Sequence, residues 1–327
     1  METSLWQNKI LLVNEQNFET LALEIFHYQS KNCPVYCQYL SYLKTDLTKV
    51  TNLLQIPFLP ISFFKNFEIK TNYFEAEKTF ESSSTNGIGT SKHCVKSIEW
   101  YEKICTQNFN FQFKNNENYC HLALLPAYLE RQNSSLVYQI SHFINASKYA
   151  ESNFYLYNHA ELAKQILENE SKQIPTILWG VTFALLDFAE KYQLNLKHTT
   201  IIETGGMKGR RKEITRNELH EILKKALGVS TIAGEYGMTE LMSQAYALEN
   251  GIYQSPPQMR VFTTEINDPF AYIKNAKNGR LNIIDLANID SCCFIATDDL
   301  GKTYSNKIFE VLGRIDHSDT RGCNLLV

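Results

Sequence analysis

The alternation of apolar and polar positions divides the chain into a helical beginning, a mixed middle and a strand-rich end. Apolar residues recur at helical spacing from residue 18 to 26 and again from 36 to 43. This periodicity predicts that the first ~75 residues are mostly helical, up to a break at Pro57–Pro60. The apolar positions of the first predicted helix are Phe18, Leu21, Ala22, Ile25 and Phe26.

The middle of the chain alternates short apolar runs with helical patterns. A helix is predicted over 183–192, and a second one begins at the capping box of Thr215 and Glu218 and ends at Gly228. Strands alternating with helices predict a largely parallel sheet covered by helices, whose ligands bind at the carboxyl ends of strands. The predicted strands are Ile177–Trp179, Thr200–Ile202 and Thr231–Ala233.

After about residue 255 the pattern changes to successive short strands, which predicts a smaller β-rich lobe. We therefore predict an α/β core over residues 1–255, a β-rich subdomain over 256–312 and a short tail over 313–327 that carries Cys323. The predicted strands of the lobe lie at Arg260–Thr263, Leu281–Ile284, Cys293–Ala296 and Ile308–Val311.

Composition narrows the class of protein. The 32 basic and 35 acidic residues give a net charge of -3, so no basic field for nucleic acid is expected. No apolar stretch approaches the ~20 residues that span a bilayer, and the beginning of the sequence is not that of a signal peptide. We expect a cytoplasmic protein without an integral membrane segment. The eight cysteines lack zinc or redox spacing, so most are expected to be buried thiols.

Four segments carry candidate chemistry. Ser82–Lys92 combines hydroxyls, glycines and a lysine that together can cradle phosphates, although a solvated linker would use the same residues. Gly234–Glu240 places an aromatic ring before Thr and Glu, which suits a base, a phosphate and Mg²⁺, or simply the start of a helix. Thr297–Gly301 offers carboxylates at a strand end for ribose hydroxyls, or a plain turn. Gly313–Asp316 is the fourth segment.

Taken in order, these segments and the Gly205-Gly206 turn resemble the adenylate-forming superfamily of acyl- and aryl-CoA synthetases. Within it, the closest likeness is to the bacterial acyl-protein synthetases, the fatty-acid ligase component of the bioluminescence fatty-acid reductase, which are grouped with the phenylacetate-CoA ligases. The stretches that carry this closer likeness are Glu203–Arg210, Glu235–Leu241, Arg321–Leu326 and Leu124–Arg131.

The resemblance implies an adenylate-forming core and a set of ATP contacts. Tyr236 and Gly237 would lie at the adenine, beside a backbone opened by Gly205 and Gly206. Asp299 would hold the ribose, with Arg314 nearby. The residues implied at the β- and γ-phosphates are Ser83, Ser84, Thr85 and Gly87, with Lys92 supplying positive charge.

The resemblance also implies a reaction. Thr239 would touch the α-phosphate and Glu240 would bind Mg²⁺, so that ATP activates a carboxylic acid, in the first instance a fatty acid, as an acyl-adenylate. Cys323 matches the cysteine that accepts the acyl group in acyl-protein synthetases and presents it to a protein partner such as a reductase.

The sequence departs from the superfamily in two places. Ser84 and Asn86 stand where glycine and Thr or Ser are usual, and the chain ends about ten residues after Gly313–Asp316, so we expect the C-terminal lid domain to be absent. Two alternatives therefore stay open. One is a ligase that transfers the acyl group to CoA or to a carrier thiol in trans. The other is a non-catalytic acyl-binding subunit.

Overall fold

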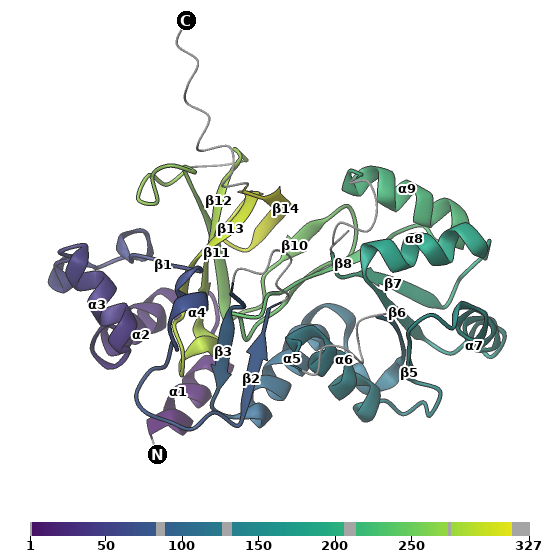
Figure 1. Cartoon of the computed structure of the whole chain (residues 1–327), viewed down its shortest axis with the longest axis horizontal. Helices are drawn as coiled ribbons and strands as arrows, with labels where there is room; N and C mark the ends of the chain where they lie inside the picture. Colours follow the sequence, from purple (N-terminus) through teal and green to yellow (C-terminus); the bar gives the residue numbers. More distant parts are fainter. Residues whose placement is uncertain (1, 83–88, 126–132, 206–213, 274–275, 316–327) are drawn as a thin grey trace, which may run out of the picture.

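The computed structural model describes residues 2–82, 89–125, 133–205, 214–273 and 276–315 (Figure 1). The chain begins with helices, as the apolar spacing predicts, and all five positions of the first predicted face are buried in α2. The helices and short strand of this part are α1 (Glu2–Leu11), α2 (Phe18–Asn32), α3 (Pro34–Tyr42), η1 (Leu47–Lys49), η2 (Leu53–Gln55), β1 (Leu59–Pro60) and α4 (Phe63–Asn66).

One large sheet organises the rest of the described chain, and its first half is parallel. The strands lie in the order β5-β4-β6-β7-β8, and every neighbouring pair among them is parallel. The buried apolar runs of β6 and β7 confirm the predicted strands Ile177–Trp179 and Thr200–Ile202. The third predicted strand, Thr231–Ala233, is misplaced, since β8 begins only at Ala233. The bounds are β4 (Cys120–Leu124), β5 (Asn153–Tyr155), β6 (Thr176–Gly180), β7 (Thr199–Glu203) and β8 (Ala233–Tyr236).

The second half of the same sheet is antiparallel and continues from β8 in the order β9-β10-β14-β13-β12-β11. The predicted β-rich lobe is thus present, but it shares a sheet with the core, since β10 pairs with both β9 and β14. The domain boundaries remain predictions. The strands are β9 (Ala245–Ala247), β10 (Ile252–Gln254), β11 (Met259–Thr264), β12 (Gly279–Asp285), β13 (Phe294–Thr303) and β14 (Ile308–Arg314).

Helices cover both faces of the parallel half: α8 and α9 lie together on one face, and α5 and α6 on the other (Figure 1). The predicted capping box is present, with Thr215 and Glu218 bonding each other's backbone, and Gly228 ends α9 in the left-handed conformation at φ 69°. The bounds are α5 (Ile98–Phe113), η3 (Asn116–Asn118), α6 (Ser135–Ala146), α7 (His159–Ser171), α8 (Thr182–Lys191) and α9 (Arg216–Leu227).

The N-terminal helices pack on the antiparallel half. Gln29 of α2 is fully buried and donates hydrogen bonds to the carbonyls of Asn288 and Ile289, both at 3.1 Å. Its side-chain amide oxygen, Oε1, accepts a hydrogen bond from the backbone N–H of Cys293 at 2.9 Å. Because Asn288 lies in η4 (Leu286–Asn288), α2 fixes the connection between β12 and β13.

A separate hairpin carries the ends of the hydroxyl-rich loop. Strands β2 (Lys78–Glu81) and β3 (Lys92–Val95) pair antiparallel, with Glu81 opposite Lys92. Figure 1 shows this hairpin between the N-terminal helices and the helices of the parallel half. Across the described residues, no helix combines the length and apolar character that crossing a membrane requires.

Candidate active site

The ends of the hydroxyl-rich loop are held together. The N–H of Ser82 donates to the carbonyl of Ser91 at 3.0 Å, and the N–H of Ser91 donates to the hydroxyl of Ser82 at 2.9 Å. Lys92 is exposed at the start of β3. The predicted phosphate contacts themselves, Ser83, Ser84, Thr85 and Gly87, lie outside the described residues, as does Asn86.

Tyr236, Asp299 and Arg314 form one cluster. The hydroxyl of Tyr236 donates to Asp299 Oδ2 at 2.8 Å, and Arg314 Nε lies 3.6 Å from Asp299 Oδ1. Burial raises the pKa of the Asp299 carboxyl, while Tyr236 and Arg314 oppose this change by stabilising its charged form. The side chain of Arg314 is 85% exposed, so its contribution is screened by solvent. Three of the residues predicted to bind the nucleoside are therefore neighbours.

The secondary structure around this cluster corrects the sequence analysis. Thr297–Gly301 was expected at the end of a strand, with a plain turn as the alternative, but Asp299 lies inside β13, directly opposite Arg314 in β14. Against β12, Leu300 pairs with Arg280 and Ala296 with Asn282, so residues 297–299 of β13 lie opposite Leu281 alone, which makes a bulge in β13. A bulge accommodates turn-favouring residues within a continuous strand, which explains why the local sequence was misleading.

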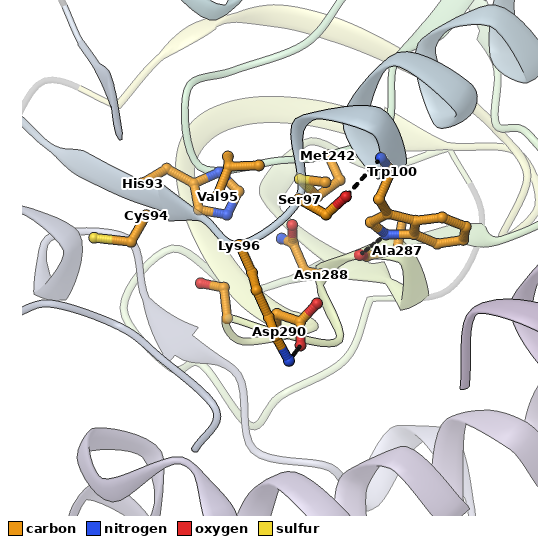
Figure 2. A pocket seen from close by; sticks show the side chains of 11 residues that line it. His93, Cys94, Val95, Lys96, Ser97, Trp100, Met242, Ala287, Asn288 and Asp290 are labelled. Atoms are coloured by element: carbon orange, nitrogen blue, oxygen red, sulfur yellow. Dashed lines mark hydrogen bonds and ion pairs between the residues drawn. The ribbon is translucent and has the colours of Figure 1, made fainter. Parts of the chain in front are cut away.

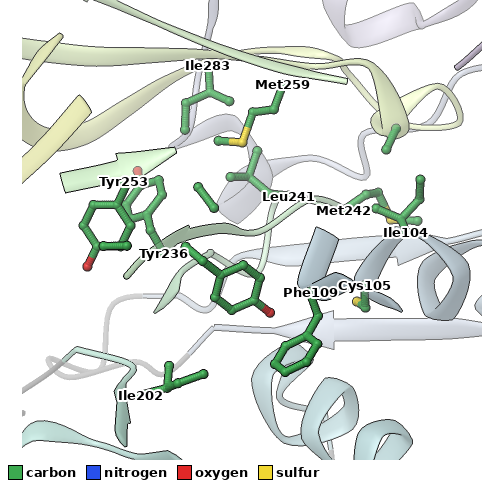
Figure 3. Packing of buried hydrophobic residues seen from close by; sticks show 14 of the residues in the cluster. Ile104, Cys105, Phe109, Ile202, Tyr236, Leu241, Met242, Tyr253, Met259 and Ile283 are labelled. Atoms are coloured by element: carbon green, nitrogen blue, oxygen red, sulfur yellow. The ribbon is translucent and has the colours of Figure 1, made fainter. Parts of the chain in front are cut away.

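The ring of Tyr236 packs on other aromatic rings. Its centroid lies 5.3 Å from that of Phe309 and 5.8 Å from that of Tyr253, both in tilted or edge-on geometry. Figure 3 shows Tyr236 and Tyr253 side by side in the apolar core. Only 8% of Tyr236 is exposed, so the core fixes the position of its ring.

Thr239 and Glu240 lie in a turn after β8, and the alternative of a helix start is excluded for these two residues. Glu240 is buried at 5% exposure, and burial raises the pKa of its carboxyl. The hydroxyl of Ser91, at the end of the hydroxyl-rich loop, forms a side-chain hydrogen bond with Glu240 that favours the charged form. The hairpin of β2 and β3, which carries the ends of the hydroxyl-rich loop, thus meets the segment predicted to bind the α-phosphate and Mg²⁺.

The segment that follows Glu240 is fixed by Asp285, a residue that sequence reasoning missed. Its buried carboxylate accepts the N–H groups of Met242 and Ser243 at 3.0 and 2.8 Å and the hydroxyl of Ser243 at 2.7 Å. These three bonds satisfy a carboxylate removed from water. The position of Asp285 at the end of an apolar strand gave no local indication of this role.

Gly205 lies in a turn set by another residue that the sequence analysis did not assign. Glu203 Oε1 accepts the hydroxyl of Thr182 and the N–H of Gly205, the latter at 2.8 Å. Gly205 has φ 75°, and no atom of the described residues lies within 4 Å of the place a Cβ would occupy. Glycine is therefore favoured here by the backbone conformation. Gly206 lies outside the described residues.

Gly237 has side chains close to it. A Cβ there would lie 2.5 Å from Glu235 Oε1 and 3.2 Å from Gln244 Cγ, so both side chains would have to move. Burial raises the pKa of Glu235 to about 8, and the nearby Glu203 adds to this effect. A buried acid therefore lies beside Gly237. Cys323 lies outside the described residues.

Comparison with solved structures shows the class to which this arrangement belongs. The chain is similar to 2-hydroxyisobutyryl-CoA ligase in an open conformation with 2-HIB-AMP and CoA, at 11% identity and TM-score 0.63 over 90% of this chain and 73% of that one. It is also similar to ATP-bound MatB from Rhodopseudomonas palustris, at 14% identity and TM-score 0.54 over 74% of this chain. A third neighbour is the AMP complex of MenE from Bacillus subtilis, at 15% identity and TM-score 0.51, again over 74%.

The fold is therefore the core of the adenylate-forming ligases, as the ordered segments predicted. The match spans about half of MatB and of MenE, 49% of each chain. A family model described as "Acyl-protein synthetase, LuxE" matches residues 12–327, and this chain belongs to that family. A comparison with curated proteins gave no significant match.

Proposed function

We propose that this chain activates a carboxylic acid, in the first instance a fatty acid, with ATP and passes the acyl group to a protein thiol. The observation that carries the proposal is the group of Tyr236, Asp299 and Arg314, joined by one hydrogen bond and one ion pair, with Glu240 in the turn that follows β8. An aromatic edge, a carboxylate and a cation suit a nucleoside with its phosphates. Membership of an acyl-protein synthetase family supports the same reaction.

In the first step a carboxylate oxygen of the acid attacks the α-phosphorus of ATP. A new P–O bond forms, the bond to the β-phosphate oxygen breaks, and pyrophosphate leaves with that electron pair. The product is an acyl-adenylate, a mixed anhydride. Residues Ser83, Ser84, Thr85 and Gly87 and the ammonium of Lys92 are proposed to hold the leaving phosphates, and the Thr239 hydroxyl the α-phosphate.

Glu240 fits the requirements of a magnesium ligand. Mg²⁺ is commonly held by one or two carboxylates together with substrate phosphates. Burial raises the pKa of Glu240 although Ser91 and Arg314 oppose this change, which means that its charged form is only partly compensated in the described structure. A bound divalent cation would restore that charged form. The ion supplies positive charge beside the phosphates, and Glu240 would hold it there.

In the second step a thiolate attacks the carbonyl carbon of the acyl-adenylate. A thioester forms, the C–O bond to the phosphate breaks, and AMP leaves, while the thiol proton goes to solvent. We propose Cys323 as this thiol, which would then present the acyl group to an accepting protein such as a reductase.

The decisive experiment is acid-dependent exchange of labelled pyrophosphate into ATP, across aliphatic and aromatic acids, with mass spectrometry of the intact protein. Exchange together with a hydroxylamine-sensitive mass increase of one acyl group is the expected result. Exchange without acylation of the protein would favour transfer to CoA or a carrier thiol in trans. Failure to bind ATP in calorimetry, with each acid present, would contradict the proposal and favour a non-catalytic subunit.

A further inference from the structure

Two side chains from distant parts of the chain hold the backbone of the turn that carries Thr239 and Glu240. His93 Nδ1 lies 2.8 Å from the carbonyl oxygen of Thr239, and Asn288 Nδ2 donates to the carbonyl oxygen of Glu240 at 2.9 Å. His93 comes from β3 and Asn288 from η4. Both residues are almost completely buried, at 1% exposure each.

The role of His93 in this contact is fixed by chemistry. A carbonyl oxygen only accepts hydrogen bonds, so Nδ1 carries the proton and donates. Complete burial lowers the pKa of His93 to about 4, which leaves the ring neutral near pH 7. The ring is therefore a fixed donor under ordinary conditions.

The two contacts together determine the direction of the Glu240 side chain. The Thr239 carbonyl belongs to the planar peptide unit before the Glu240 Cα, and the Glu240 carbonyl belongs to the unit after it. A backbone has only two soft dihedrals per residue, and these describe how the two planes meet. Holding both planes fixes φ and ψ of Glu240 and so the direction of its Cα–Cβ bond.

The same hairpin supplies a third contact. Ser91, whose hydroxyl bonds the Glu240 carboxyl, lies two residues before His93, and residues two apart in extended chain point to the same side. The hydroxyl-rich loop ends at this point. The position of the loop and the direction of Glu240 are therefore coupled through one short strand.

The space behind the turn does not suit a ligand. Figure 2 shows a pocket lined by His93, Asn288, Trp100 and Met242, with the Lys96–Asp290 ion pair at its side. Its volume of about 10 Å³ is on the order of one water molecule. Trp100 closes it by donating from Nε1 to the Ala287 carbonyl at 3.0 Å. The contacts of His93 and Asn288 thus serve the turn itself.

We propose that His93 and Asn288 are positioning residues that orient Thr239 and Glu240 toward the phosphates and metal of Mg·ATP. This inference rests on the proposed function. It assigns the two residues a role in metal-dependent nucleotide binding that goes beyond holding the fold, because they fix the backbone on both sides of the proposed metal ligand.

Substitutions of His93 distinguish the loss of the hydrogen-bond donor from the loss of side-chain volume. His93→Asn keeps a donor near the place of Nδ1, whereas His93→Gln extends its donor toward the place of Nε2, and His93→Ala has none. We expect the Ala and Gln variants to lower kcat for pyrophosphate exchange by about 10- to 100-fold with little change in KM for the acid. His93→Asn should restore most of the rate. Asn288→Leu should resemble His93→Ala.

A second measurement does not depend on turnover. Calorimetry of ATP binding at increasing Mg²⁺ should show that His93→Ala and Asn288→Leu need more Mg²⁺ for half-maximal binding than wild type and His93→Asn. His121→Asn is the matched control. His121 is an equally buried histidine of β4 whose Nε2 bonds the Asn116 carbonyl at 3.2 Å, far from the turn in sequence and contact. Its variant should change thermal stability without changing the Mg²⁺ requirement.

The outcomes distinguish the inference from the proposed function. An active wild type with an unchanged Mg²⁺ requirement and rate in folded His93→Ala would overturn the inference alone. An equal shift in His121→Asn would overturn it as well, since the effect would then be general. If His93→Ala does not fold, Asn288→Leu and His93→Gln decide the same question. A wild type that neither binds Mg·ATP nor exchanges pyrophosphate would overturn the proposed function itself.

Discussion

The hydroxyl of Tyr236 in β8 donates a hydrogen bond to Asp299 in β13 at 2.8 Å, although three strands separate β8 from β13 in the sheet. Four strand spacings in a flat sheet would place the two backbones about 19 Å apart. The contact therefore requires strong curvature between the parallel and antiparallel halves. That curvature brings a residue of the core and a residue of the β-rich lobe to one place.

Removal of this hydrogen bond should weaken the fold more than nucleotide binding. Tyr236→Phe retains the ring that packs on Phe309 and Tyr253 but leaves Asp299 without its hydroxyl donor. We expect a loss of about 1–3 kcal/mol in the free energy of urea unfolding. ATP affinity in calorimetry should remain close to wild type, whereas Tyr236→Ala should lose it. Equal loss of ATP binding in both variants would contradict an adenine contact made by the ring.

Glu240 should be required for the chemistry and dispensable for the fold. Glu240→Gln keeps the size of the side chain but removes the negative charge proposed to hold Mg²⁺. We expect pyrophosphate exchange to fall by about 100-fold or more. The thermal midpoint at pH 7 should not decrease, because burial disfavours the charged form of this carboxyl and raises its pKa. Glu249→Gln, at an exposed position, is the control for the substitution. Wild-type exchange in Glu240→Gln would exclude its metal role.

Glu235 should make the protein less stable as the pH rises. Its pKa is raised by burial from 4.5 to about 8, so the folded state holds a proton that the unfolded state has lost between these values. The stabilisation is fully present below about pH 4.5 and is lost as the pH rises toward about 8.

The corresponding measurement is urea unfolding of wild type and Glu235→Gln from pH 5 to pH 8. The wild-type free energy should fall relative to the variant, with a slope of at most about 1.4 kcal/mol per pH unit. Glu265→Gln, an exposed glutamate of the β-rich half, should follow wild type. Parallel curves for wild type and Glu235→Gln would show that Glu235 titrates normally.

Gly228 should tolerate no side chain. It ends α9 at φ 69°, and a Cβ there would lie 2.6 Å from Asn195 Cα and 2.7 Å from the Leu194 carbonyl oxygen. Gly228→Ala should therefore lower the free energy of unfolding by about 1–3 kcal/mol. Gly205→Ala is a matched comparison, since Gly205 has φ 75° and no atom of the described residues lies within 4 Å of its Cβ position. Gly205→Ala should lose less free energy of unfolding than Gly228→Ala. Equal losses in the two variants would show that the positive φ alone, and not the contacts of the Cβ, causes the destabilisation.

The thiol acceptor can be tested with a cysteine that the structure describes. Cys323→Ser should abolish the hydroxylamine-sensitive acyl adduct seen by intact mass while pyrophosphate exchange continues, because adenylation precedes transfer. Cys37→Ser is the control, since Cys37 in α3 is the exposed cysteine of the described residues. A full adduct on Cys323→Ser, lost in Cys37→Ser, would move the acceptor to Cys37.

Much of the fold was predictable because its signals are local. The capping box of Thr215 and Glu218 and the apolar runs of β6 and β7 each depend on neighbours within a few residues. The order of motifs predicted the class of protein. Asp299 was expected at a strand end but lies inside β13, because a bulge within a strand and a turn favour the same residues.

The positioning contacts were not predictable, because they join side chains to backbone atoms far away in sequence. His93 bonds a carbonyl 146 residues later, and a carbonyl is present at every position, so no residue type marks its partner. Asp285 likewise binds N–H groups near Ser243, 42 residues earlier. A lone histidine in a strand is equally consistent with many buried environments.

The attachment of α2 to the far end of the sheet has a consequence for biosynthesis. Phe26 packs on Phe294, with ring centroids 5.9 Å apart, and the side chain of Gln29 bonds the backbone of Ile289 and Cys293. At about 5–20 residues per second, the ribosome needs roughly 13–54 s to translate the stretch from Phe26 to Phe294. During that time this helix can pack on α3 but lacks its partners in β13 and η4, so part of its apolar face is expected to stay uncovered on the nascent chain until residues near 294 have been synthesised.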